Sequence, residues 1–283
     1  MLAYRHAFHA GNHADVLKHL VLVQVLRHLG EKDKPFTLVD THAGAGGYSL
    51  EGRYAHKRDE HEDGIGRLWR RDDLPPPVAD YVQQVRDFNA GGGLQQYPGS
   101  PALAQQLLRP ADPMRLYELH PTDYRILEAF LATRPHTQVG MSDGFAALKA
   151  ALPPPSRRGV VLIDPSYELK SDYAKVLAAV RECLQRFAEG VVLVWVPQLQ
   201  LVEAGQLLHR LQATAEAAPK GWLHARLTVA QSGERGFGLV GSSMFVVNPP
   251  HPLHGTLQDT LPWLTDVLGQ YDGAHYLLEH RAR

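Results

Sequence analysis

Two patterns of hydrophobic and polar positions alternate along most of the chain. Short runs of β-branched and aliphatic residues are each followed by a longer stretch with apolar residues at helical spacing. Such alternation predicts a mostly parallel sheet with helices packed on it. The first helical stretch is expected to be capped by Asn12 and to run to about Gly30. Its apolar positions are Val16, Leu20, Val23, Leu26 and Leu29.

The strand-like runs fall into two groups. Two late runs, 223–229 and 243–247, are separated by the glycine-rich loop 233–241, which predicts a hairpin and an antiparallel last strand. Parallel strands followed by such a hairpin are typical of the Rossmann-like, class I methyltransferase form of the α/β sheet. The earlier runs, with predicted helices between them, are 36–39, 114–117, 138–140, 160–163 and 191–195.

The strand pattern disappears between about 50 and 97. Charged residues, the prolines 75–77 and a helical stretch over 78–88 replace it, and the glycines 91–93 close the segment. No internal repeat or low-complexity linker divides the chain. We therefore expect a single domain over 1–283 with a small helical insertion subdomain at about 50–97.

Composition is that of an ordinary globular protein, with 44% hydrophobic and 21% charged residues. No apolar run approaches the roughly 20 residues of a membrane span, so no membrane partner is expected. The single cysteine, Cys183, is interpreted as a core thiol, and the expected compartment is the reducing cytoplasm. The net charge of −1 neither indicates nor excludes nucleic-acid binding, because an enzyme that turns over needs only a local basic patch.

The turn after the first predicted strand has the form D-x-x-x-G-x-G over 40–46. Glycines here let the backbone approach a ligand closely, and the following N–H groups can face it. A nicotinamide fingerprint would place a glycine at position 49, where the chain has Ser49. The pattern instead fits an S-adenosylmethionine site with Asp40 near the methionine end. A tight turn without a ligand is the alternative.

Two further acidic residues follow the next two strands. Glu118 can accept hydrogen bonds from ribose hydroxyls, and Asp143 can accept one from the cofactor's adenine amine. A solvated strand end and a helix N-cap, respectively, are the alternatives. Three acidic strand ends in sequence, with Asp40, favour a bound nucleoside, because α/β ligands lie at the carboxyl ends of strands.

Asp164-Pro165-Ser166-Tyr167 follows the fully apolar fourth strand. The N6 amine of adenine is a poor nucleophile because its lone pair is delocalised into the ring. Two acceptors aimed at its hydrogens favour the tetrahedral nitrogen of the transition state. Asp164 is expected to supply one acceptor and the Pro165 carbonyl the other, while Tyr167 offers a face on which an extruded base can stack.

A second tetrapeptide, Asn248-Pro249-Pro250-His251, fits the same loose pattern. It follows the last predicted strand, which is expected to be antiparallel, so that its carboxyl end points away from the cofactor crevice. The catalytic role is therefore assigned to the Asp164 tetrapeptide.

Several histidines near the N-terminus raise the question of a metal site. His6, His9 and His13 have no nearby cysteine and no H-E-x-x-H pattern, so no metal is expected. The preferred interpretation places His19 and His42 beside the cofactor and the Tyr4 region at the substrate mouth.

Five segments closely resemble the bacterial 23S ribosomal RNA adenine-N6 methyltransferase J family, and the similarity spans essentially the whole chain. The N-terminal string is the most specific of them. They are 4–19, 40–46, 97–101, 118–121 and 157–159.

The resemblance implies S-adenosylmethionine as cofactor and 23S ribosomal RNA as partner, in a protein-free or early assembly form, acted on by a monomer. It implies that the residue matching Asp164 is the catalytic acceptor and that the one matching Tyr4 contacts the target nucleotide. Residues implied to line the cofactor site are His19, His42, Ser100, Glu118, Asp143, Gly144 and Asp164.

The family tetrapeptide is normally D-P-P-Y, and Ser166 replaces its second proline. Because Asp164, the Pro165 carbonyl and Tyr167 remain, activity is expected to survive. An older label linking such proteins to the use of external DNA keeps a DNA adenine methyltransferase or a DNA-utilisation protein open as the alternative. The same chemistry on a protein glutamine amide, and a non-enzymatic nucleic-acid-binding protein, are further hypotheses.

Overall fold

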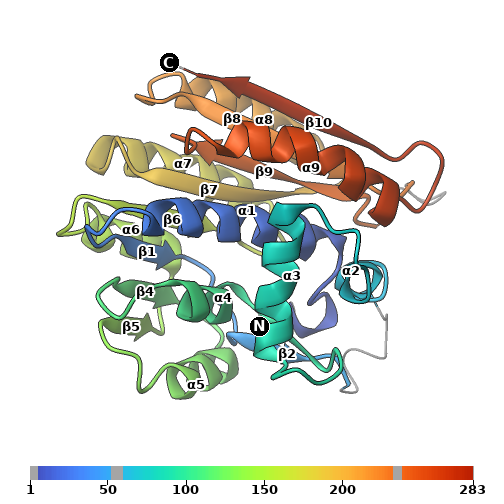
Figure 1. The fold of residues 1–283 in the computed structure, drawn as a ribbon. Helices are drawn as coiled ribbons and strands as arrows, with labels where there is room; N and C mark the ends of the chain where they lie inside the picture. The colour runs from blue at the N-terminus through green and yellow to red at the C-terminus, as the bar shows by residue number, and fades with distance from the viewer. Residues whose placement is uncertain (1–5, 52–59, 232–237, 283) are drawn as a thin grey trace.

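The computed structural model describes residues 6–51, 60–231 and 238–282. One large sheet runs through the molecule and carries helices on both faces (Figure 1). Its strands, in order across the sheet, are β10 (His275–Arg281), β8 (Trp222–Thr228), β9 (Gly241–Val247), β7 (Val191–Gln198), β6 (Gly159–Ile163), β1 (Thr37–Asp40), β4 (Met114–Tyr117) and β5 (Thr137–Gly140).

The strand directions confirm the predicted sheet. β5, β4, β1, β6 and β7 are parallel to one another, and β9 is antiparallel to both β7 and β8. The chain builds the sheet outward from β1 through β4 to β5, then returns to place β6 on the other side of β1. The order therefore reverses between β1 and β6, which is where a doubly wound sheet opens its ligand crevice.

Alternate strand residues point to opposite faces and build two separate cores. On β6, Val160 and Leu162 belong to one core, and Val161 and Ile163 belong to the other. The first core takes in α1 (His13–Gly30), α2 (Ile65–Trp69), α3 (Pro76–Phe88), α4 (Ser100–Leu107), α5 (Pro121–Phe130) and α9 (Leu253–Leu268). The second takes in α6 (Gly144–Ala151), α7 (Ser171–Arg186) and α8 (Val202–Ala215).

Helix α1 is buried on nearly every side, because it lies between the sheet and the helices α3, α4 and α9 (Figure 1). The predicted cap is confirmed: the Asn12 side-chain oxygen accepts from the backbone N–H groups of Ala14 and Asp15, each at 3.0 Å. This cap fixes where α1 begins. The first turns of α1 thereby reach the carboxyl end of β6. There, the Lys18 side chain of α1 bonds Asp164.

The segment predicted as an insertion contains α2 and α3, and α3 confirms the helical stretch expected over 78–88. A short antiparallel pair, β2 (Gly47–Ser49) and β3 (Gln96–Pro98), brings the two ends of the segment together. Residues 52–59 lie outside the described part of the chain. The division into one domain with an insertion subdomain at about 50–97 stays a prediction.

The expectation that the sheet ends at the second late run was incomplete, because β10 adds an antiparallel edge strand beside β8. A one-turn 3-10 helix, His6–Phe8, precedes α1. Cys183 is buried as predicted, and burial raises the pKa of its thiol to about 12. Within the described ranges, no helix has both the length and the apolar character to cross a membrane.

Candidate active site

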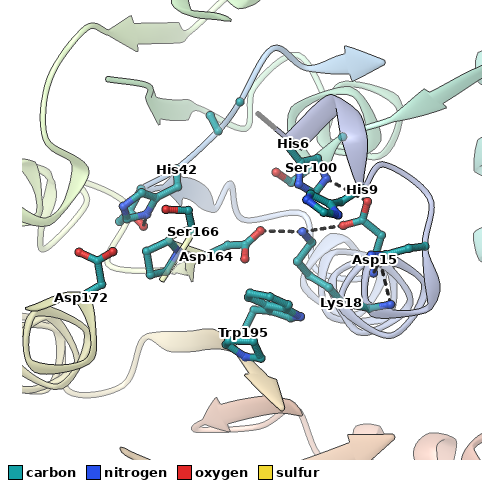
Figure 2. Close-up of a pocket in the computed structure, with 18 of the residues that line it drawn as sticks. His6, His9, Asp15, Lys18, His42, Ser100, Asp164, Ser166, Asp172 and Trp195 are labelled. Atoms are coloured by element: carbon teal, nitrogen blue, oxygen red, sulfur yellow. Dashed lines mark hydrogen bonds and ion pairs between the residues drawn. The ribbon is translucent and has the colours of Figure 1, made fainter. Parts of the chain in front are cut away.

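A cavity of about 650 Å³ opens at the carboxyl ends of the central strands (Figure 2). Its wall includes His42 after β1, Glu118 after β4, Ser142 after β5 and Asp164 after β6. The cavity therefore lies where the strand order reverses, as expected for a doubly wound sheet. Its size is within the range of small-molecule sites.

The structure brings most of the predicted site residues to this cavity. Pro165, predicted to supply a carbonyl, lines it beside Asp164. Tyr4 lies outside the described residues. The residues predicted to hold the cofactor all line the cavity, and they are His19, His42, Ser100, Glu118, Asp143, Gly144 and Asp164.

Tyr167 is a predicted site residue that the structure does not bring to the cavity wall, and Asp40 is another. The Tyr167 side chain is 5% exposed, and its hydroxyl donates to the Trp195 carbonyl at 2.6 Å. Its ring packs against Tyr173 and Trp195, with centroids 4.8 Å and 5.9 Å away. The Trp195 ring lines the cavity instead. Tyr167 thus anchors the loop after β6 to β7, and its role as a stacking face for a base stays a prediction.

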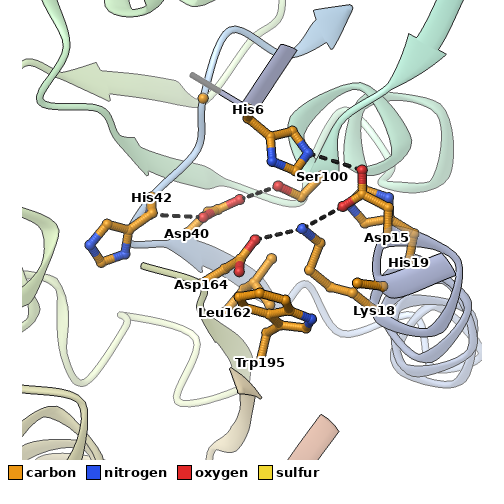
Figure 3. A network of polar contacts seen from close by, with 12 residues as sticks. His6, Asp15, Lys18, His19, Asp40, His42, Ser100, Leu162, Asp164 and Trp195 are labelled. Carbon is orange, nitrogen blue, oxygen red and sulfur yellow. Dashed lines mark hydrogen bonds and ion pairs between the residues drawn. The ribbon is translucent and has the colours of Figure 1, made fainter. Parts of the chain in front are cut away.

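Lys18 is a site residue that sequence reasoning missed. Its ammonium lies between two carboxylates, 2.6 Å from Asp164 Oδ2 and 2.8 Å from Asp15 Oδ1 (Figure 3). Although burial disfavours the charge, these carboxylates raise the pKa of Lys18 above its ordinary value. A buried, permanently charged lysine therefore holds the carboxylate of the tetrapeptide in one orientation. The spacing of Asp15 and Lys18 on one face of α1 was the available signal.

Asp15 continues this network away from Asp164. Its second oxygen, Oδ2, bonds His6 Nε2 at 2.9 Å (Figure 3). The same oxygen accepts from the Gly11 N–H at 2.9 Å. Desolvation acts against ionisation, but His6 and Lys18 together lower the pKa of Asp15 well below its ordinary value. The described part of the N-terminal segment is thereby bonded to the network that reaches Asp164.

Asp40 is fully buried behind the cavity wall, and its partners carry no formal charge. It accepts from the Ser100 hydroxyl at 2.6 Å and from the His42 N–H at 3.1 Å (Figure 3). Burial raises the pKa of Asp40 to about 7, against the effect of these two hydrogen bonds. Asp40 therefore positions the turn and Ser100, which themselves line the cavity.

Glu118 holds the glycine turn after β1 in place. Its Oε2 accepts from the Gly44 N–H at 2.8 Å, and its Oε1 accepts from the His120 N–H at 2.6 Å. Desolvation is the main cause of the raised pKa of Glu118. Gly44 has a φ of 64°, and a Cβ there would overlap the Tyr48 hydroxyl, so the turn requires glycine.

Asp143 and Gly144 form the start of α6 at the cavity edge. The Asp143 carboxylate caps the helix by accepting from the Phe145 N–H at 2.9 Å, the arrangement foreseen as the structural alternative. A Cβ on Gly144 would overlap the Thr41 carbonyl, so glycine lets α6 pack against the turn after β1. Asp143 is nevertheless exposed and can accept further hydrogen bonds from a ligand.

Three histidines of the cavity wall, His13, His19 and His42, are neutral at physiological pH. Burial lowers the pKa of His19 to about 3, and of His13 and His42 to about 4. His19 Nδ1 shares a hydrogen with the Tyr97 hydroxyl at 2.7 Å. Among the residues the structure describes, no three His, Cys, Asp or Glu side chains are arranged to hold a metal ion.

The competing tetrapeptide at Asn248 has a structural role. Asn248 is buried and does not line the cavity. Its side-chain amide donates to the carbonyls of Ala188 and Gly190, at 2.7 Å and 2.9 Å, and accepts from the Lys220 N–H at 3.0 Å. The antiparallel direction of β9 places it away from the cavity, as the predicted topology required.

Comparisons with known proteins identify the chain's relatives. Residues 33–280 match the sequence model of a family described as "Ribosomal RNA large subunit methyltransferase D, RlmJ". The chain is 45% identical over 268 residues to "Ribosomal RNA large subunit methyltransferase J" of Escherichia coli, covering 95% of this chain and 94% of that protein. It is 43% identical over 269 residues to the protein of the same name from Haemophilus influenzae, with the same two coverages.

A solved structure agrees with this relationship. A crystal structure of a Legionella pneumophila protein superposes with a TM-score of 0.88 at 33% identity. It covers 96% of this chain and 98% of that chain. The two chains therefore share their fold over nearly their whole length.

Proposed function

We propose, from the premise that this chain belongs to the ribosomal RNA large subunit methyltransferase J family, that it transfers a methyl group from S-adenosylmethionine to the N6 amine of an adenine in 23S ribosomal RNA. Family membership confirms the resemblance found in the sequence. The adenine and its N6 atom are the finer part of the proposal, and the tetrapeptide 164–167 supports them. The observation that carries this part is the Asp164 carboxylate, held in the cavity wall by Lys18.

Asp164 has the geometry that amine methylation needs. Among the described residues, its partner is Lys18, which bonds Oδ2. This bond fixes the orientation of the carboxylate. Its other oxygen, Oδ1, accepts a hydrogen bond from the adenine amine. The Pro165 carbonyl accepts the second, because proline constrains the backbone directly after Asp164. Both acceptors favour a tetrahedral, electron-rich nitrogen in the transition state.

The remaining lining residues suit the cofactor. When bound, S-adenosylmethionine supplies an electrophilic methyl group on its sulfonium. Glu118 accepts from the ribose hydroxyls and Asp143 from the adenine amine, while the turn held by Asp40 faces the methionine end. Neutral His19 and His42 line the site without adding positive charge beside the sulfonium. The carboxylates that line the cavity and the glycine turn thus fit the donors and the charge of this cofactor.

The substrate contact rests on shape more than on charge. The net charge of −1 implies weak long-range attraction for RNA, so recognition of a folded segment by its shape is expected. As the resemblance implies, Tyr4 is proposed to contact the target nucleotide. The protein is also proposed to act as a monomer in the cytoplasm. Its substrate is a protein-free or early assembly form of the RNA.

Transfer of label from methyl-labelled S-adenosylmethionine tests this proposal. The acceptors are a protein-free 23S ribosomal RNA transcript, double-stranded DNA and a glutamine-containing protein extract. Label on the transcript, recovered after digestion as N6-methyladenosine, is the expected result. Label on DNA alone supports the DNA adenine methyltransferase instead, and label on protein glutamine supports the amide methyltransferase.

A further inference from the structure

Aliphatic side chains lie in the cavity wall beside the tetrapeptide and at the adjoining start of α8. Leu169, in the loop after β6, is 53% exposed, and Leu201 and Val202, at the start of α8, are 39% and 71% exposed. Leu199 and Leu169 also line the cavity itself. We call these four residues the aliphatic rim. Single exposed leucines are ordinary, but several on adjacent loops at a cavity mouth indicate a surface that a ligand covers.

Three contacts hold the aliphatic rim in place. Helices α7 and α8 pack side by side, so the loops that precede them are neighbours. Lys170 Nζ bonds Glu203 Oε1 at 2.7 Å and joins the loop before α7 to the first turn of α8. The Tyr167 hydroxyl ties the tetrapeptide loop to the Trp195 carbonyl on β7. The rim is thereby fixed next to the segment that contains Asp164, Pro165 and Ser166.

We propose that the aliphatic rim packs against the bases flanking the target adenine and fills the space that this adenine leaves when it enters the cavity. The inference rests on the proposed function, since it needs an RNA base in the cavity. Removing a base from its stack costs a few kcal/mol, and nucleic-acid-binding proteins offset such a loss by inserting aliphatic side chains between base steps.

The charges around the rim favour base contacts over phosphate contacts. Lys170, the residue after Leu169, has its ammonium paired with Glu203, and Lys175, in the cavity wall, lies 3.7 Å from the Asp172 carboxylate. The protein as a whole carries a net charge of −1. The aliphatic rim therefore contributes binding free energy that does not depend on the release of counterions from phosphates.

Continuity with the cavity favours RNA over a protein partner. Leu169 and Leu199 belong both to the rim and to the cavity wall, so a ligand whose base occupies the cavity passes directly over them. A stable protein interface buries roughly 800 Å² on each partner. A second copy seated on the rim would cover the mouth that the substrate must enter.

The double variant Leu201→Ser/Val202→Ser tests the rim without threatening the fold. Leu201 occupies the N-cap of α8 with no side-chain capping bond, and serine is a preferred residue there. Ile126→Ser on α5 is the matched control, because Ile126 is 48% exposed and does not line the cavity. Methyl transfer to a 23S ribosomal RNA transcript and its dissociation constant are measured between 50 and 200 mM salt (roughly the range over which phosphate contacts weaken).

The double variant is expected to lose about tenfold in kcat/KM for the transcript, with S-adenosylhomocysteine affinity unchanged. The slope of log affinity against log salt stays that of wild type, because no phosphate contact is removed. Ile126→Ser behaves as wild type.

Each other outcome overturns a defined statement. If wild type methylates the transcript and the double variant matches it, the rim proposal is wrong and the proposed function stands. A changed salt slope shows that the rim contacts phosphates. A wild-type dimer that the double variant converts to monomers shows that the rim joins two copies. If wild type binds the transcript but does not methylate it, the proposed function fails, and the binding constants still decide the rim.

Discussion

Strand β1 has a buried aspartate at each end, and the protein holds the two carboxylates in opposite ways. At the amino end, Asp112 accepts from the backbone N–H groups of Phe36 and Arg109 and from the Arg109 guanidinium, at 2.9–3.1 Å. At the carboxyl end, Asp40 accepts from the Ser100 hydroxyl and the His42 N–H. Desolvation affects both, but Arg109 brings the pKa of Asp112 below its ordinary value, while the pKa of Asp40 rises to about 7.

The same contrast extends to the cations at the two ends. At the amino end, Arg158 donates to the Leu29 and Lys34 carbonyls, and Arg109 donates to the Lys32 carbonyl. These arginines hold the backbone segment at the end of α1 and directly after it in place. At the carboxyl end, Lys18 bonds the Asp164 carboxylate at the cavity wall. Arginines bonded to Asp112 and to backbone carbonyls therefore build one end of the sheet, and groups with perturbed pKa values beside a cavity mark the reactive end.

Replacing Lys18 by methionine is expected to have the largest effect, because it removes the cation of the reactive end. Asp164 then loses the bond that orients it, and kcat for methyl transfer is expected to fall about 100-fold. Lys149→Met, at an exposed position on α6, is the control and keeps wild-type kinetics. Cofactor binding, measured by calorimetry, verifies folding. A variant that binds the cofactor and keeps its kcat would contradict the orienting role of Lys18.

Replacing Asp112 by alanine is expected to reduce stability and leave catalysis intact. The buried N–H groups of Phe36 and Arg109 lose their acceptor, which lowers the free energy of unfolding by about 3 kcal/mol. Urea denaturation measures the loss, and Asp112→Asn, which keeps one acceptor oxygen, is expected to lose about half as much. Methyl transfer per folded molecule stays at the wild-type value. A large fall in methyl transfer per folded molecule would contradict the assignment of a structural role to the amino end of β1 and a catalytic role to its carboxyl end.

Asp40 is expected to make stability depend on pH. Its folded-state pKa of about 7 lies above the unfolded value of 3.8, so its stabilising contribution is present in acid and is lost as pH rises from about 4 to 7. Between pH 5 and pH 8, the free energy of unfolding of wild type should fall by about 2 kcal/mol more than that of Asp40→Asn. Urea denaturation at the two pH values measures this difference. Parallel curves for the two proteins would show that Asp40 does not titrate in this window.

Restoring the family proline with Ser166→Pro is expected to have the smallest effect. The change restricts the unfolded chain and is worth under about 1 kcal/mol. Asp164 and its bond from Lys18 are untouched, so kcat/KM stays within about threefold of wild type. Initial rates on the 23S transcript measure it. Loss of activity on restoring the proline would show that the serine tunes this site.

The local pattern of apolar and polar positions was sufficient to predict most of the strands and helices of the fold. The strand predicted at 114–117 has the same bounds in the structure, because alternating apolar residues and a following helix define it without reference to its neighbours. β10 was not predicted, because this edge strand is largely exposed on both faces and its sequence contains only two leucines. Its pairing with β8, seven residues on each side, creates the strand.

The site residues likewise fall into those that the local sequence predicted and those that depend on tertiary packing. Strand ends indicated the residues that line the cavity, since the topology alone brings Glu118, Asp143 and Asp164 to one edge of the sheet. Lys18 was missed, although Asp15 lies one turn before it, because a lysine within a helix ordinarily points to solvent. Its burial follows from the packing of α1 across the sheet. The inward turn of Tyr167, with a φ of 54°, likewise depends on contacts with Trp195 that lie 28 positions ahead in the chain.

Methyl transfer by Asp164→Ala tests the central claim most directly. The measurement is the rate of N6-methyladenosine formation in a 23S ribosomal RNA transcript, per molecule of enzyme that binds S-adenosylhomocysteine. Loss of the acceptor at the reactive end should lower this rate at least about 100-fold, while Asp112→Ala, which removes the structural carboxylate, retains it. An Asp164→Ala protein that binds cofactor and methylates the transcript at the wild-type rate would contradict the account.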